Sequence, residues 1–187
     1  MPQIHAQPAV LSPHPSSPSE VVRAVRAQAR IEDSDALVLD YSLDAELSRV
    51  RVPPADTGAR ADALWRHTCF EAFLAPVQGA GYHEFNFSPS GEWAVYRFGG
   101  YRNGMAPAKI DQAPQISTRR RDGRLELGAT VRLGALVELR DARRIKVALA
   151  AVIEDEDGRL SYWALRHPPG KPDFHHATAF AMEVSRP

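Results

Sequence analysis

The clearest alternation of apolar and polar positions lies over Ala36–Leu43. Every second residue of this stretch is apolar, and the positions between include Asp40 and Ser42. A period of two sends alternate side chains to opposite faces, so the pattern predicts a strand with one face in a core. Val21–Ile31 alternates less regularly; propensity alone permits a helix there, but the strand that follows favours a strand partner. The apolar face of the first stretch consists of Leu37, Leu39, Tyr41 and Leu43.

Two hairpins are predicted further along the chain. Asp122-Gly123 separates Arg119–Arg121 from Arg124–Leu133, and glycine supplies the positive φ that a tight turn needs. Ile145–Glu154 and Leu160–Arg166 flank a second turn in the same way. Short strands with frequent turns favour a β-sandwich over alternating strands and helices. The other expected features are core positions at Ile145, Val147, Leu149 and Ile153, a closing strand over 177–184, loops over 44–64 and 106–114, and a short helix within 133–141.

Aromatic and charged residues gather between positions 65 and 105. Three strands are expected there, over 67–74, 82–88 and 92–98, and each alternates between two faces. Side chains on neighbouring strands lie close enough to contact one another. The polar side chains that these strands could bring together are Glu71, Glu84, Asn86 and Arg97.

Such a set suits a small polar ligand. Sugar hydroxyls donate and accept hydrogen bonds, which carboxylate, amide and guanidinium groups can match. The same residues also have ordinary structural explanations, because aromatic rings often fill a core and Glu71 with Arg97 could form a cross-strand ion pair. The aromatic rings available to stack on a sugar are Trp65, Trp93, Tyr96, Tyr101 and Trp163.

Four motifs run in order along the chain: WRHTCFEAF at 65–73, EFNFSPSGEWAVYRF at 84–98, YRNGM at 101–105 and KPDFHH at 171–176. With SPHPSSP at 12–18 as an opening arm, the chain resembles the DOMON-like proteins of bacteria, relatives of the family 9 carbohydrate-binding modules. The resemblance implies an all-β, immunoglobulin-like antiparallel β-sandwich and, by analogy, sugar or haem binding.

In the family 9 modules two Trp residues sandwich the sugar beside carboxylate, amide and Arg partners. The resemblance therefore implies a sugar platform at Trp65 through its local motif and at Trp163 through strand order. Together with the strand faces, it gives these ligand-binding candidates: Trp65, Arg66, Glu71, Glu84, Asn86, Arg97 and Trp163.

Composition limits the other classes of function. The 187 residues suit one domain, and the formal net charge of zero disfavours nucleic-acid binding, which needs a positive excess. We expect no membrane partner, because no apolar run approaches the ~20 residues of a membrane span. A single cysteine rules out an intrachain disulfide, and no secretion signal is recognisable, so a cytoplasmic location is expected.

The first 19 residues differ from the rest, because they contain five prolines. Proline disfavours helices and regular sheet hydrogen bonds, so this stretch is a disordered tail or an extended arm, and the resemblance favours the arm. We therefore divide the chain into an arm over 1–19 and a sandwich domain over 20–187. Residues 4–14 are expected to dock through Ile4, Val10 and Leu11.

Metal, haem and catalytic sites receive little support. His67, Cys69, His83, His175 and His176 are scattered without the spacing of a zinc site. Met105 with His167 or His175 could ligate haem, but no motif supports it. Glu71 and Glu84 could act as acid and base on a glycoside, yet no GxSxG, P-loop or GxGxxG motif is present.

The sequence thus predicts a non-enzymatic binding module, without a cofactor, for a carbohydrate or similar small polar ligand. The alternative is a structural or protein-interaction domain with no small ligand. A concave slot would favour the sugar, and a large flat patch would favour a protein partner.

Overall fold

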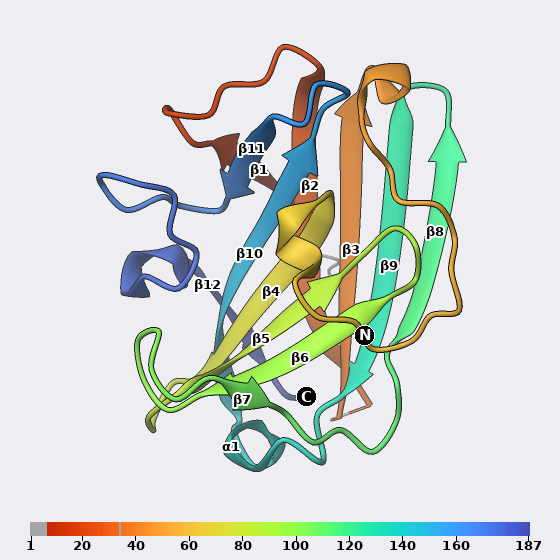
Figure 1. The fold of residues 1–187 in the computed structure, drawn as a ribbon. Helices are drawn as coiled ribbons and strands as arrows, with labels where there is room; N and C mark the ends of the chain where they lie inside the picture. The colour runs from red at the N-terminus through yellow and green to blue at the C-terminus, as the bar shows by residue number, and fades with distance from the viewer. Residues whose placement is uncertain (1–6, 34) are drawn as a thin grey trace.

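The computed structural model describes residues 7–33 and 35–187, and it is an antiparallel β-sandwich (Figure 1). This confirms the predicted fold class. Sheet A contains β2 (Val22–Glu32), β3 (Ala36–Ala45), β9 (Arg124–Arg132) and β8 (Gln115–Arg121), in that order. Sheet B runs β7 (Ala106–Pro107), β6 (Trp93–Phe98), β5 (Tyr82–Phe87), β4 (Cys69–Pro76) and β10 (Arg144–Glu154), and both β11 (Leu160–Ala164) and β12 (Met182–Ser185) pair with β10.

The predicted period-two faces meet between the sheets. Leu37, Leu39 and Leu43 of β3 are fully buried in one continuous core, and so are Val147 and Leu149 of β10. The strand at Val21–Ile31 is confirmed as β2, and the helix within 133–141 is confirmed as α1 (Val137–Arg140). The turn at Asp122-Gly123 is also confirmed, since Gly123 has a φ of +70° between β8 and β9.

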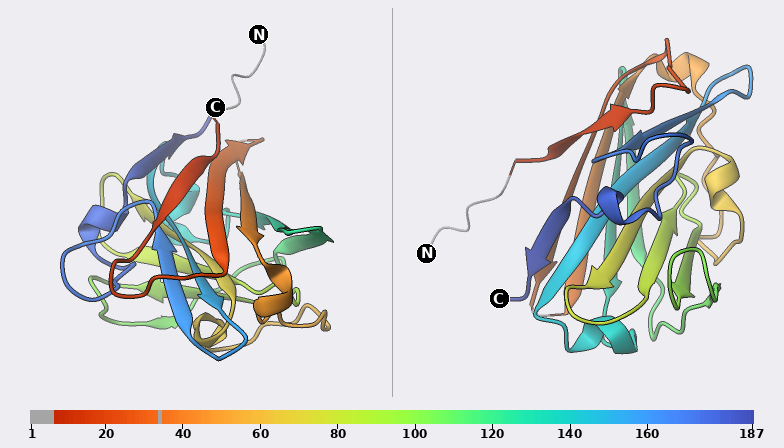
Figure 2. Two further views of the ribbon diagram at one scale, coloured as in Figure 1. Left: turned by 90° about the horizontal axis from the view of Figure 1, so that it is seen from above. Right: turned by 90° about the vertical axis from the view of Figure 1, so that its left-hand side faces the viewer.

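Sheet B is buried on its outer face as well. All six residues of β5 are buried, so the strand does not alternate between core and solvent. Phe73, Tyr82 and Phe98 form a second apolar cluster on the outer side, where Phe174 and Phe180 cover them. These last two belong to the 165–181 segment, which lies over sheet B (Figure 2, right). A cavity can therefore form between the sheet and this covering segment.

The proline-rich arm contains strand β1 (Ala9–Pro13), which joins the two sheets. Its first half pairs with β2 and its second half with β11 (Figure 2). Leu11 is 1% exposed in the core, whereas Val10 is 62% exposed. Ile4 lies outside the described residues. Among residues 7–33 and 35–187, no helix is both long enough and apolar enough to cross a membrane.

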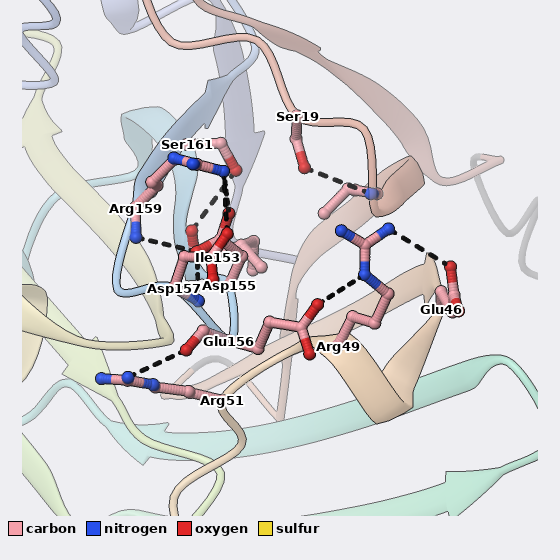
Figure 3. A network of polar contacts seen from close by, with 11 residues as sticks. Ser19, Glu46, Arg49, Arg51, Ile153, Asp155, Glu156, Asp157, Arg159 and Ser161 are labelled. Atoms are coloured by element: carbon pink, nitrogen blue, oxygen red, sulfur yellow. Dashed lines mark hydrogen bonds and ion pairs between the residues drawn. The ribbon is translucent and has the colours of Figure 1, made fainter.

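Ion pairs hold the β10–β11 turn against the loop that follows β3 (Figure 3). Arg49 Nε donates to Glu156 Oε1 at 2.7 Å, and Arg51 Nη2 donates to the Glu156 carbonyl at 2.9 Å. Glu154, at the end of β10, is also bonded to Arg51 at 3.0 Å and to His67 Nδ1 at 2.7 Å. His67 directly follows the short 3₁₀ helix Leu64–Arg66, so its contact with Glu154 ties the end of the helix that carries Trp65 to β10.

Candidate functional site

A cavity of about 320 Å³ lies on the outer face of sheet B. Strands β4, β5, β6, β10 and β11 supply its floor, and the loops around Arg102 and Phe174 supply its walls. The strands provide this floor because their outward residues alternate with those of the inter-sheet core. The lining residues are Trp65, Glu71, Glu84, Phe98, Arg102, Met105, Val152, Tyr162, Pro172, Phe174 and His175.

Glu71 is the most unusual residue of the floor. Its side chain is 3% exposed, and Oε1 has no hydrogen-bond partner among the described residues. Burial raises the pKa of the Glu71 carboxyl well above its ordinary value, and the neighbouring Glu84 raises it further. A buried polar atom without a partner is costly, so Glu71 is the least satisfied carboxyl group of the cavity floor.

Glu84 lies beside Glu71 on the adjacent strand β5. Its Oε1 accepts a hydrogen bond of 2.9 Å from Asn86 Nδ2, while Oε2 lies 3.7 Å from His175 Nε2. Burial raises the pKa of Glu84 too, although the Asn86 hydrogen bond and the charge of Arg102 oppose that rise. Asn86 thus orients one carboxylate oxygen and leaves the other to the cavity.

A chain of hydrogen bonds orients His175. The backbone N–H of Arg102 donates to Tyr82 Oη at 3.2 Å, and Tyr82 Oη lies 2.7 Å from His175 Nδ1. Since Tyr82 Oη already accepts from Arg102, the simplest assignment has it donating to Nδ1, which leaves the proton on Nε2 toward Glu84. Asp173 fixes Arg102 through Nη2 at 2.8 Å. These hydrogen bonds hold the polar wall of the cavity in one arrangement without a ligand.

We expect the His175 imidazole to stay neutral until the pH falls to about 4, because burial and the charge of Arg102 lower its pKa to that value. The unfolded chain binds this proton near pH 6.5, so the stability contributed by neutral His175 is lost as pH falls between those values. An NMR titration of the ring protons measures the midpoint. Tyr82→Phe should raise it, and a wild-type midpoint near 6.5 would contradict the assignment.

Aromatic rings form the rest of the wall. Trp65 is half-buried and meets Tyr96 edge-on, with ring centroids 5.9 Å apart. Tyr162 of β11 is also half-buried and lies 6.1 Å from Phe174. Both therefore present partly open rings to the cavity, as stacking against a ligand requires.

Three of the predicted site residues, Trp65, Glu71 and Glu84, line the cavity, and Asn86 supports Glu84 from behind. The predicted convergence of Arg97 with Glu71 is wrong. The register pairs Glu84 with Tyr96 and His83 with Arg97, so Arg97 belongs to the opposite face of sheet B. There it is exposed and forms an ion pair with Glu138 of α1.

Trp163 and Arg66 also lie away from the cavity. Trp163 is 4% exposed in the core between the sheets, where its Nε1 donates to Ser161 Oγ at 3.0 Å. Its neighbour Tyr162 takes the outward position because side chains alternate along β11. Arg66 is exposed to solvent and does not contribute to the lining.

Four further residues line the cavity that alternation along the strands did not predict: Arg102, Tyr162, Phe174 and His175. Three of the four lie in the motifs YRNGM and KPDFHH, so the motifs themselves carried the signal. No group of three or more His, Cys, Asp or Glu residues in the described part of the chain is arranged to hold a metal ion. His175 Nδ1 is bonded to Tyr82 Oη, and Nε2 points toward Glu84 at 3.7 Å.

No family model matches the chain, and no curated protein matches it. Solved structures do match. A proposed carbohydrate-binding protein of Bacteroides uniformis is 17% identical with a TM-score of 0.69, covering 96% of this chain and 84% of the other. A family 9 carbohydrate-binding module of Caldicellulosiruptor kristjanssonii is 12% identical in complexes with glucose (TM-score 0.52, covering 91% and 78%) and cellotriose (0.55, covering 97% and 82%). At these identities the matches show a shared fold: the chain has the β-sandwich of carbohydrate-binding modules.

Proposed function

We propose that this protein is a non-catalytic module that binds a carbohydrate in the cavity on the outer face of sheet B. The observation that carries the proposal is Glu71, a buried carboxyl group in the lining of a cavity with aromatic walls, whose Oε1 has no hydrogen-bond partner among the described residues. Ligand sites combine apolar walls with a few placed polar groups in this way. The volume of about 320 Å³ lies at the lower end of the usual range of ~300–1,000 Å³, which favours one or two sugar units.

The lining provides both kinds of contact that a sugar needs. Carboxylate oxygens of Glu71 and Glu84 accept from hydroxyl groups, and the rings of Trp65 and Tyr162 lie at the walls for the C–H faces. The solved modules of the same fold that hold glucose and cellotriose support this chemistry. The concave shape favours a small ligand over a flat protein interface.

Titration calorimetry with a panel of mono- and disaccharides tests the proposal. Trp65→Ala should weaken binding roughly tenfold or more, a loss of at least ~1.4 kcal/mol, because the cavity loses a wall. Arg97→Ala is the matched control, since this exposed side chain lies on the other face and its loss should leave the affinity unchanged. Absence of binding across the panel, or equal loss in both variants, would refute the site.

A further inference from the structure

The floor of the cavity offers acceptors without matching donors. Glu71 Oε1 has no partner among the described residues, and Glu84 Oε2 lies 3.7 Å from His175 Nε2, beyond hydrogen-bonding distance. Two buried carboxyl groups on adjacent strands thus line the same cavity. Buried carboxylates normally have a cation or several donors, so Glu71 is incomplete at Oε1.

The cation nearest to the pair is already engaged. Arg102 donates through Nε and Nη2 to Asp173 Oδ1, at 3.3 and 2.8 Å. Asp173 also accepts from the hydroxyl of Tyr101 and from the backbone N–H of His175. Arg102 therefore stays at the rim, bonded to Asp173; it lowers the pKa of Glu84 through its charge but makes no hydrogen bond to either carboxyl group of the floor.

A hydroxyl group fits this floor incompletely. It carries one hydrogen to donate and no positive charge to balance the buried carboxyl groups once they are ionised. A protonated amine has three N–H donors, no acceptor and a positive charge. Bonds between such a cation and a carboxylate are roughly twice as strong as neutral ones.

We propose that Glu71 and Glu84 bind the protonated amine of an amino sugar, so that the ligand class is the unacetylated amino sugars. The inference rests on the proposed sugar-binding function of the same cavity. The ammonium group lies between the two carboxylates, and the sugar ring extends toward Trp65 and Tyr162 at the walls.

Glu71 and Glu84 are the groups of this cavity whose protonation we expect to change when the ligand binds. The thiol of Cys69 and the hydroxyl of Tyr41 pack against Glu71, and burial raises the pKa of each well above its ordinary value, so both are neutral near pH 7. The other titratable groups facing the pair are Tyr82, Tyr96 and His175, which are neutral at that pH, and the Arg102–Asp173 ion pair. In the free cavity burial raises the pKa of both acids, and Glu84 raises that of Glu71 further, so the pair holds a proton to higher pH than ordinary carboxyl groups do. An arriving ammonium keeps its own proton, and the carboxyl pair releases one to the buffer.

Calorimetry near pH 7 with glucosamine, N-acetylglucosamine and glucose provides the test, carried out in two buffers of different ionisation enthalpy. Glucosamine should bind at least tenfold more tightly than either neutral sugar. Its enthalpy should vary with the buffer, reporting proton release, while that of glucose should not. If a neutral sugar binds as tightly as glucosamine, the inference is overturned and the sugar-binding function stands. If none of the three binds, both are overturned.

Matched variants locate the effect. Glu71→Gln and Glu84→Gln keep the side-chain shape and remove the charge, so each should lower glucosamine affinity at least tenfold and reduce glucose affinity much less. Glu156→Gln removes a carboxylate that is half exposed and paired with Arg49 outside the cavity, and it should change neither affinity. Circular dichroism confirms that each variant is folded. Equal losses for both sugars would show that the carboxylates do not select the amine.

Discussion

Leu11→Ala is expected to destabilise the protein by about 2–5 kcal/mol, although it lies in a proline-rich arm. The Leu11 side chain is 1% exposed, within the core between the sheets. Its strand β1 also joins sheet A to sheet B, so the surroundings cannot easily collapse into the space. In a domain of this size, each 1 kcal/mol lowers the melting temperature by roughly 2–4 °C. Urea and thermal unfolding measure both quantities.

Val10→Ala is the matched control on the same strand. Val10 is 62% exposed, so its truncation should change stability by less than about 0.5 kcal/mol. Similar small effects for the two variants would show that the arm is not part of the folded unit. A large effect of Val10→Ala together with a small effect of Leu11→Ala would show that β1 pairs with its faces exchanged.

Wild type is expected to lose stability as pH rises, and the Glu71→Gln variant is expected not to show this loss. The unfolded chain releases the Glu71 proton near the ordinary pKa of 4.5, while burial and Glu84 keep it bound in the folded protein. Between these two pKa values the folded state holds more protons, so the free energy of unfolding falls with pH by up to ~1.4 kcal/mol per unit. The variant lacks this contribution. Its advantage should grow above pH 4.5 and be small below it.

Urea unfolding at intervals between about pH 4 and pH 8 measures the difference. Glu156→Gln should follow the wild-type curve, since its carboxylate is half exposed and paired with Arg49. A constant offset between Glu71→Gln and wild type across the range would mean that the folded protein does not retain the Glu71 proton.

The strands themselves could be predicted because their apolar positions alternate, but the relative register of neighbouring strands could not. Alternation predicts that Glu84 and Arg97 are polar side chains of adjacent strands that lie close together. The β5–β6 hairpin instead aligns Glu84 with Tyr96, which sends Arg97 to the opposite face. A one-residue difference in register exchanges the two faces, and the sequence of a single strand does not determine it. The same alternation separates Trp163, in the core, from Tyr162, at the cavity.

The wall of the cavity on the outer face of sheet B also could not be predicted from the periodicity of the sequence. Sheet B is covered on both faces, so β5 is buried throughout and its polar residues resemble a solvent face in the sequence. The cover comes from the 165–181 segment, which is distant from β5 in the chain. No local pattern links His175 to Glu84, and the motif KPDFHH alone drew attention to that segment. Alternation could thus place the two carboxyl groups on neighbouring strands, while the residues around them depended on long-range packing.

The join made by β1 has a consequence for synthesis of the protein. Ser12 accepts a hydrogen bond from His167, 155 residues later, so β1 leaves the ribosome well before the segment that it contacts. Until β11 has emerged, β1 can pair with β2 but cannot bridge it to sheet B. Pairing between such distant segments folds slowly, and an open edge can recruit a strand from another chain. The nascent domain is therefore exposed to misassembly until β11 has left the ribosome.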